Sequence, residues 1–215
     1  MSKQLTAFSL LLLFPFVMMA PATASSIPLK SLPAGSFALQ DRYQFDLSIM
    51  GSPLASEQQC VAYLRQKNPL PETAVSAKEL VRIFYEEARH EGIRPDVAFA
   101  QSLHETGFFR YGGDVLPPQN NYAGLGTTGN GVKGAWFKSP RQGIRAQIQH
   151  LKGYATPVAP QGILVDPRYD LLKKTPFFGK QKTWQALNGK WAVPGRNYGQ
   201  TILRIHQEIL KMPRN

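Results

Sequence analysis

The chain has 215 residues, of which 43% are hydrophobic and 18% are charged, proportions typical of a globular protein and too apolar for an intrinsically disordered one. This length allows one domain with extensions, and a single cysteine excludes a disulfide framework or a cysteine-based zinc site. Residues 1–110 hold 10 basic and 10 acidic side chains, whereas residues 111–215 hold 15 basic and 4 acidic, which accounts for the net charge of +11. The second half therefore favours an anionic partner.

The first 24 residues have the order of a secretory signal peptide. Lys3 is the one charge before the uncharged stretch Ala7–Ala20, and Ala22-Thr23-Ala24 supplies a cleavage site before Ser25. The uncharged stretch is shorter than the ~20 residues that span a bilayer. We therefore expect export to the periplasm or the extracellular space, with no transmembrane anchor after cleavage and no nucleic acid as partner.

Residues 25–55 read as an extended lead-in, with prolines and a short alternating piece, Tyr43–Leu47, that favours an edge strand. Helix-start patterns then begin, because Ser56–Gln59 and Ser76–Glu79 are capping boxes and Gly92 is typical of a helix end. Further helices are predicted to start at Pro95 and Pro140 and to cover Thr183–Leu187 and Tyr198–Met212. The sequence thus predicts one mainly α domain over residues 56–212.

Residues 107–134 are rich in Gly, Asn and Pro, which predicts an irregular loop or a small hairpin. Gly124–Gly129 spells G-x-G-x-x-G, but no strand precedes it, so a dinucleotide site is not indicated. His104-Glu105 does not continue into H-E-x-x-H, and the other histidines lack metal-ligand spacing. We expect neither a cofactor nor a metal ion.

Glu105 is the first charged residue after the uncharged run Val97–Leu103, and it falls in the last turn of the predicted helix. The negative end of the helix dipole and partial burial both disfavour ionisation of a carboxyl group there. A general acid must keep its proton near neutral pH, so Glu105 is the candidate for acid catalysis. The alternative is a surface glutamate paired with Arg110.

Several ordered motifs resemble the glucosaminidase domain of glycoside hydrolase family 73. The motifs are Ala98-Phe99-Ala100-Gln101-Ser102-Leu103-His104-Glu105-Thr106-Gly107, Gln119-Asn120-Asn121-Tyr122-Ala123-Gly124-Leu125-Gly126, Gly143–Leu151, Asp166-Pro167-Arg168-Tyr169 and Trp191–Tyr198. The resemblance implies a lysozyme-like helical fold and cleavage of the β-1,4 bond after N-acetylglucosamine in peptidoglycan. It also implies Glu105 as the catalytic acid, Tyr198 in the active site, and the paired asparagines in the loop after the acid.

Sugars present apolar ring faces and many hydroxyls, so aromatic and amide side chains suit the walls of a sugar cleft. The candidate substrate-binding residues are Asn120, Asn121, Tyr122, Gly124, Trp136, Phe137, Trp191 and Asn197. Glycoside hydrolysis usually needs a second, ionised group. Asp114 is the candidate for this second group. Asp166 or Asp170 would serve if the chain folds back, although Asp166-Pro167 is also typical of a turn. The third option is the substrate's own 2-acetamido group, oriented by Tyr198.

Three functions remain open from the sequence. The first is a monomeric peptidoglycan N-acetylglucosaminidase whose basic half attracts anionic cell-wall polymers. The second is an inactive wall-binding module, because the hairpin region of residues 124–145 has no acid. The third is a muramidase or lytic transglycosylase on the same scaffold.

Overall fold

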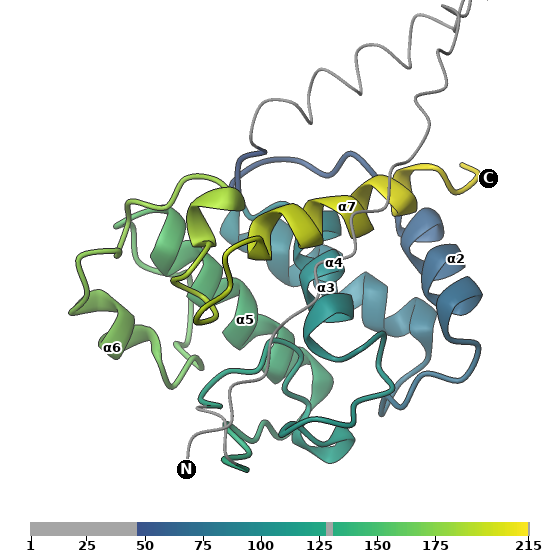
Figure 1. The fold of residues 1–215 in the computed structure, drawn as a ribbon, viewed down its shortest axis with the longest axis horizontal. Helices are drawn as coiled ribbons and strands as arrows, with labels where there is room; N and C mark the ends of the chain where they lie inside the picture. Colours follow the sequence, from purple (N-terminus) through teal and green to yellow (C-terminus); the bar gives the residue numbers. More distant parts are fainter. Residues whose placement is uncertain (1–46, 128–130, 215) are drawn as a thin grey trace, which may run out of the picture.

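The structure is a computed structural model that describes residues 47–127 and 131–214. Within these ranges the chain forms six α-helices and no β-strand, so the mainly α prediction is confirmed (Figure 1). The helices are α2 (Glu57–Lys67), α3 (Ala77–Glu91), α4 (Pro95–Glu105), α5 (Pro140–Ala155), α6 (Tyr169–Lys173) and α7 (Tyr198–Leu210). The predicted signal peptide lies outside the described residues.

The predicted helix starts are confirmed by the capping geometry. At Ser56 the side chain accepts from the Gln59 backbone N–H and the Gln59 side chain accepts from the Ser56 N–H, so the capping box is complete. At the start of α3, the Ser76 side chain accepts from the Glu79 backbone N–H, which is one of the two bonds of a capping box. Gly92 ends α3 with a φ of 74°, a left-handed conformation that glycine adopts without a steric penalty. Pro95 occupies the first turn of α4, where its missing N–H has no partner to lose.

Three segments differ from the expectation. Thr183–Leu187 forms only a short 3₁₀ turn, η2 (Gln185–Leu187), and the short helix α6 was not predicted. Residues 47–55 pack onto the helices instead of leading in to them, because Leu47, Ile49 and Ala55 are buried. The folded unit therefore begins by Leu47. Of the predicted edge strand only Leu47 is described; the bridges Ser48–Thr183 and Met50–Ile93 follow directly after it.

Helix α4 lies at the centre of the fold. It contacts α2, α3 and α7, and α7 runs across it (Figure 1). The stretch Val97–Leu103 is buried on every side, as expected for a helix without charges in its interior. This burial fixes the position of the last turn of α4, and with it Glu105.

Residues 106–127 and 131–139 are irregular except for one 3₁₀ turn, η1 (Pro117–Gln119). The loop packs tightly on the start of α5, because a Cβ added at Gly143 would lie 1.7 Å from the Asn120 carbonyl oxygen. Only glycine permits this approach. Within the described ranges, no helix combines the length and the apolar character needed to cross a bilayer.

Candidate active site

Glu105 is the last residue of α4, and its carboxyl group is half-buried between α4 and α7. The Tyr198 hydroxyl donates a hydrogen bond to Glu105 Oε1, and the Trp191 indole donates a second bond to the carboxyl group. No arginine or lysine among the described residues pairs with it, and Arg110 instead donates to the carbonyls of Gly107 and Lys67. The pairing of Glu105 with Arg110, the alternative from the sequence, is absent within the described chain.

Burial determines the ionisation of this carboxyl group. Removal from water disfavours the charged form and raises the pKa of Glu105 to about 7, while the hydrogen bonds from Tyr198 and Trp191 lower it and limit the rise. A group with this pKa is partly protonated at neutral pH. It can therefore give up a proton as a general acid under ordinary conditions.

A chain of buried amides sets the direction of the Tyr198 hydroxyl. Gln147 Nε2 donates to Gln101 Oε1 at 2.8 Å, so Gln101 presents its amide nitrogen to Tyr198 Oη at 2.7 Å. Because the Tyr198 oxygen accepts this bond, its own proton is directed to Glu105. Both amides are fully buried, which leaves them no water to exchange with.

The backbone after Glu105 is strained. Phe108, Phe109 and Tyr111 have φ values of 60°, 57° and 56°, a left-handed conformation that costs a non-glycine residue about 1 kcal/mol or more. Thr106 helps to hold this turn, since its hydroxyl donates to Ser102 O at 2.7 Å and accepts from Phe109 N at 3.0 Å. Such strain concentrates at functional sites, and here the turn brings Tyr111, Gly113 and Asp114 to the cavity that Glu105 lines.

Glu105 and Asp114 line the same cavity, which has a volume of about 180 Å³. Asp114 is half-buried, so its carboxyl group remains accessible. The other two candidates for the second group lie elsewhere. Asp166 is buried and accepts from the Arg168 N–H at 2.8 Å, which confirms the turn interpretation of Asp166-Pro167, and Asp170 is exposed on α6.

Trp191 forms one wall of the site. Its ring stacks on Tyr198 with centroids 6.3 Å apart and an interplanar angle of 13°, and it lines a second cavity of about 210 Å³. Gly124 and Thr127 line both cavities, so both cavities border this part of the loop. A Cβ at Gly124 would lie 3.4 Å from Glu105 Oε2, and the φ of 63° also favours glycine.

Four of the candidate substrate-binding residues have their side chains engaged within the loop. Asn121 is fully buried, donating to Leu125 O and accepting from Leu125 N, both at 2.9 Å. Asn120 donates to Phe137 O at 3.0 Å and accepts from the Tyr122 hydroxyl at 3.2 Å. Tyr122 and Phe137 are buried against apolar neighbours. These four side chains therefore shape the loop through contacts within the protein.

Two other candidates are exposed but stand apart from the acid. Trp136 is 60% exposed and Asn197 is exposed at the start of α7, and neither lines the two cavities described above. Tyr198 is buried, and both contacts of its hydroxyl are to protein groups. The Tyr198 hydroxyl thus contacts the Glu105 carboxyl group rather than being directed to a substrate acetamido group.

Sequence reasoning did not single out Gln101 and Gln147. The signal was present for Gln101, because an amide in an otherwise apolar helix needs a buried partner. Its partners come from α5 and α7, and no sequence spacing identifies them. Within the described ranges, no group of three or more His, Cys, Asp or Glu side chains is placed to hold a metal ion.

A helical scaffold that holds one carboxyl group at a pKa near neutrality, beside an open cavity, is typical of the lysozyme-like glycoside hydrolases. The comparisons with known proteins define the family: the model of the Glucosaminidase family, mannosyl-glycoprotein endo-beta-N-acetylglucosaminidase, matches residues 81–211. The chain belongs to this family.

One relative comes from Borreliella burgdorferi and is described as an uncharacterized protein. It is 36% identical over 132 residues, which make up 61% of this chain and 62% of the relative. The chain thus matches less than two thirds of the relative's length. No solved structure matches the chain significantly.

Proposed function

We propose that this chain is an exported endo-β-N-acetylglucosaminidase that hydrolyses the β-1,4 bond after N-acetylglucosamine in peptidoglycan. The observation that carries the proposal is Glu105, a half-buried carboxyl group with a pKa of about 7 that lines a cavity within a glucosaminidase-family fold. Retained near neutral pH, its proton is available to the oxygen of the departing sugar.

In the proposed reaction, the bond between the anomeric carbon and the bridging oxygen breaks as Glu105 protonates that oxygen. Water supplies the hydroxyl group that the anomeric carbon gains, and the proton lost by water goes to an ionised acceptor. That Asp114 lines the same cavity as Glu105 supports Asp114 in this second role. The alternative is attack by the substrate's own 2-acetamido group, which needs no second carboxylate.

The cellular setting is also part of the proposal. The signal-peptide pattern of residues 1–24 supports export to the periplasm or the extracellular space. The basic second half supports attraction to anionic cell-wall polymers, with the protein acting as a monomer. We do not expect nucleic acid to be a partner of the exported protein.

Product analysis tests the proposal. Purified peptidoglycan is incubated with the mature protein, and the released fragments are examined by mass spectrometry before and after borohydride reduction. We expect fragments with reducing N-acetylglucosamine ends. Reducing muramic ends would instead identify a muramidase, and anhydro-muramic ends a lytic transglycosylase. Sedimentation of the protein with the walls without any released fragment would identify a binding module, and each of these three results contradicts the proposal.

A further inference from the structure

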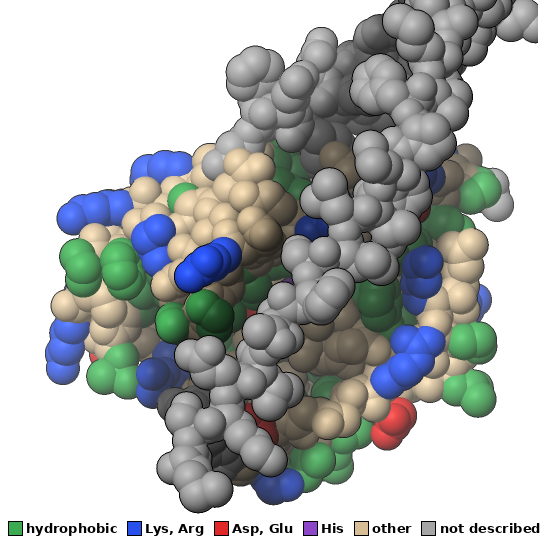
Figure 2. Space-filling model, in the orientation of Figure 1, with side chains coloured by type: hydrophobic (Ala, Val, Ile, Leu, Met, Phe, Trp, Pro, Cys, Tyr) green, Lys and Arg blue, Asp and Glu red, His purple; other side chains and the backbone are tan. Residues whose placement is uncertain are grey.

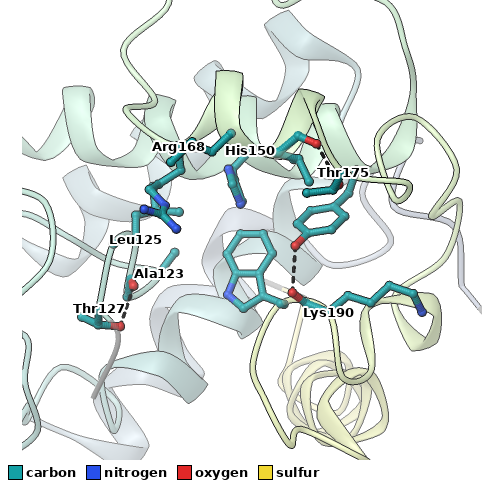
Figure 3. A pocket seen from close by; sticks show the side chains of 13 residues that line it. Ala123, Leu125, Thr127, His150, Arg168, Thr175 and Lys190 are labelled. Atoms are coloured by element: carbon teal, nitrogen blue, oxygen red, sulfur yellow. Dashed lines mark hydrogen bonds between the residues drawn. The ribbon is translucent and has the colours of Figure 1, made fainter. Parts of the chain in front are cut away.

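The second cavity, of about 210 Å³, opens beside the cavity of the acid and is lined by several parts of the chain. The lining residues are 123–127 of the loop, His150 and Tyr154 of α5, residues in and next to α6, and Lys190 with Trp191. Figure 3 shows Ala123, Leu125 and Thr127 on one side of the cavity, with Arg168 and His150 on another. Since Gly124 and Thr127 line both cavities, the two cavities border the same part of the loop.

The two cavities carry opposite charge. Among the described residues, the cavity of Glu105 contains two acids, Glu105 and Asp114, and no lysine or arginine. The second cavity contains Arg168 and Lys190 and no acid. A substrate that spans both therefore meets acidic groups at one end and basic groups at the other.

Arg168 is the cation that is free to meet a ligand. Lys190 Nζ donates to Ala186 O at 2.8 Å and lies over the Phe177 ring, and Figure 3 shows its side chain leading away from the indole. The exposed Arg168 side chain makes no hydrogen bond or ion pair with another described residue, and Figure 3 shows it reaching across the cavity. Its positive charge acts on the wall of the cavity, since it opposes the rise in the pKa of Tyr154 that burial causes.

His150 adds a second polar group on the same side. Its Nδ1 bonds to Asp166 Oδ2 at 2.7 Å, and the Asp166 side chain is fully buried behind the ring. Asp166 is the carboxylate nearest to this wall, and its charge is engaged by His150 and by the Arg168 backbone N–H. Because Nδ1 donates to the Asp166 carboxylate, the uncharged ring presents Nε2 as an acceptor, which suits a sugar hydroxyl or an amide N–H.

Trp191 links this cavity to the acid. Its indole bonds to Glu105, while its ring lies edge-to-face with His150 at 5.0 Å between centroids. A sugar ring placed against Trp191 is therefore next to the carboxyl group that protonates the bond. The substituents of that sugar then lie within reach of Arg168 and His150.

We propose that the second cavity binds a carboxylate carried by the sugar next to the cleaved bond, held by Arg168, so that the enzyme prefers acidic amino-sugar strands over neutral ones. This inference rests on the proposed function. A planar guanidinium matches a carboxylate with two parallel hydrogen bonds. In peptidoglycan the carboxylate belongs either to the lactyl group of the muramic sugar or to its stem peptide.

The test compares three substrates: peptide-free glycan strands with lactyl carboxylates, fragments with stem peptides, and neutral N-acetylglucosamine oligomers. The kcat/KM ratio of acidic to neutral substrate is measured for the wild type, Arg168→Gln and the control Lys173→Gln. Lys173 is an exposed cation of the same short helix region and lines neither cavity. We expect Arg168→Gln to lower the ratio about tenfold, the scale of one charge-assisted hydrogen bond, through a rise in KM.

A tenfold loss on the peptide-free strands alone assigns the lactyl carboxylate, because the stem peptide is attached to that group as an amide in the other fragments. A loss on the peptide-bearing fragments alone assigns a carboxylate of the stem peptide, and a loss on both shows that Arg168 accepts either carboxylate. An unchanged ratio in Arg168→Gln, or an equal loss in Lys173→Gln, overturns the inference. Affinities measured in a Glu105→Gln background keep the result independent of catalysis. If the wild type cleaves none of the substrates, the proposed function fails. The binding of a carboxylate in the second cavity is still supported if Glu105→Gln/Arg168→Gln binds acidic strands more weakly than Glu105→Gln does.

Discussion

At the scale of single residues, opposing influences meet at the Glu105 carboxyl group. Burial favours the neutral acid, while the hydrogen bonds from Tyr198 and Trp191 favour the carboxylate. The buried amides of Gln147 and Gln101 make Tyr198 a donor to Glu105. Gln147 donates to Gln101, and Gln101 donates to the Tyr198 oxygen, so the Tyr198 proton is directed to the carboxylate. The result is a pKa of about 7, between that of an ordinary glutamate and that of a fully desolvated one.

Replacing Tyr198 with Phe tests this balance through the pH dependence of kcat. The acid is active when protonated, so wild-type kcat falls as the pH rises through about 7. Removing the hydroxyl removes a bond to the carboxylate, which raises the pKa of Glu105, and we expect the alkaline limb to move to higher pH. Tyr85→Phe is the matched control, because it deletes a buried hydroxyl bonded to Ala55 O, far from the acid. A limb that stays in place, or moves to lower pH, contradicts the assignment.

The residues that sequence reasoning placed well are those fixed by the helix around them. Glu105 follows from an uncharged helix and its end, because burial and the dipole act at a position that can be read along the chain. The roles of Asn120, Asn121 and Tyr122 could not be read in this way. Their neighbours come from the folded loop, whose many backbone groups need amide partners before any ligand can use them.

At the scale of elements, capping chemistry made α2, α3 and α4 predictable, since their end signals lie within a few residues. Helix α6 has too few residues to show a period, and η2 is a single tight turn. The packing of residues 47–55 depends on a distant partner. Asp96 at the start of α4 accepts from Leu54 N at 2.7 Å and from Ala55 N at 2.8 Å, and no local pattern reveals this.

Asp96 also accepts from His206 Nε2 of α7 at 2.7 Å, and both side chains are fully buried. Asp96→Asn removes the charge and presents an amide N–H₂ to these donors. We expect a loss of about 3–5 kcal/mol in the free energy of unfolding, measured by urea denaturation at pH 7. Glu208→Gln, in the exposed pair with Lys211, should change it by less than about 1 kcal/mol. A loss of similar size in both variants contradicts the role of Asp96.

The same variant should differ in its acid denaturation. Burial alone would raise the pKa of Asp96, but the bonds from His206, Ala55 and Leu54 outweigh it and hold the pKa below the ordinary value. A lowered pKa contributes stability that is present above about pH 4 and is lost as the pH falls through the folded value. Asp96→Asn lacks this contribution, so its stability should fall less steeply on the acid side.

At the scale of the whole molecule, part of the positive charge in the second half of the sequence lies around α6. The exposed cations of the second half include Arg168, Lys173, Lys174 and Lys180 in and around α6, and Figure 2 shows basic side chains on the α6 side of the molecule. This side borders the basic cavity, while the acidic cavity lies towards the end of α4. We expect this charge to attract the proposed acidic strand towards the side next to the acid, over a range of about 10 Å that salt shortens.

The central claim, that the Glu105 proton drives cleavage, is tested most directly by Glu105→Gln assayed for release of reducing sugars from purified peptidoglycan. Gln keeps the size of the side chain but cannot donate this proton, so we expect the rate to fall by at least about a hundredfold. The thermal transition should stay nearly unchanged, because Glu105 makes no ion pair with another described residue. Release at close to the wild-type rate by a folded Glu105→Gln protein would contradict the account.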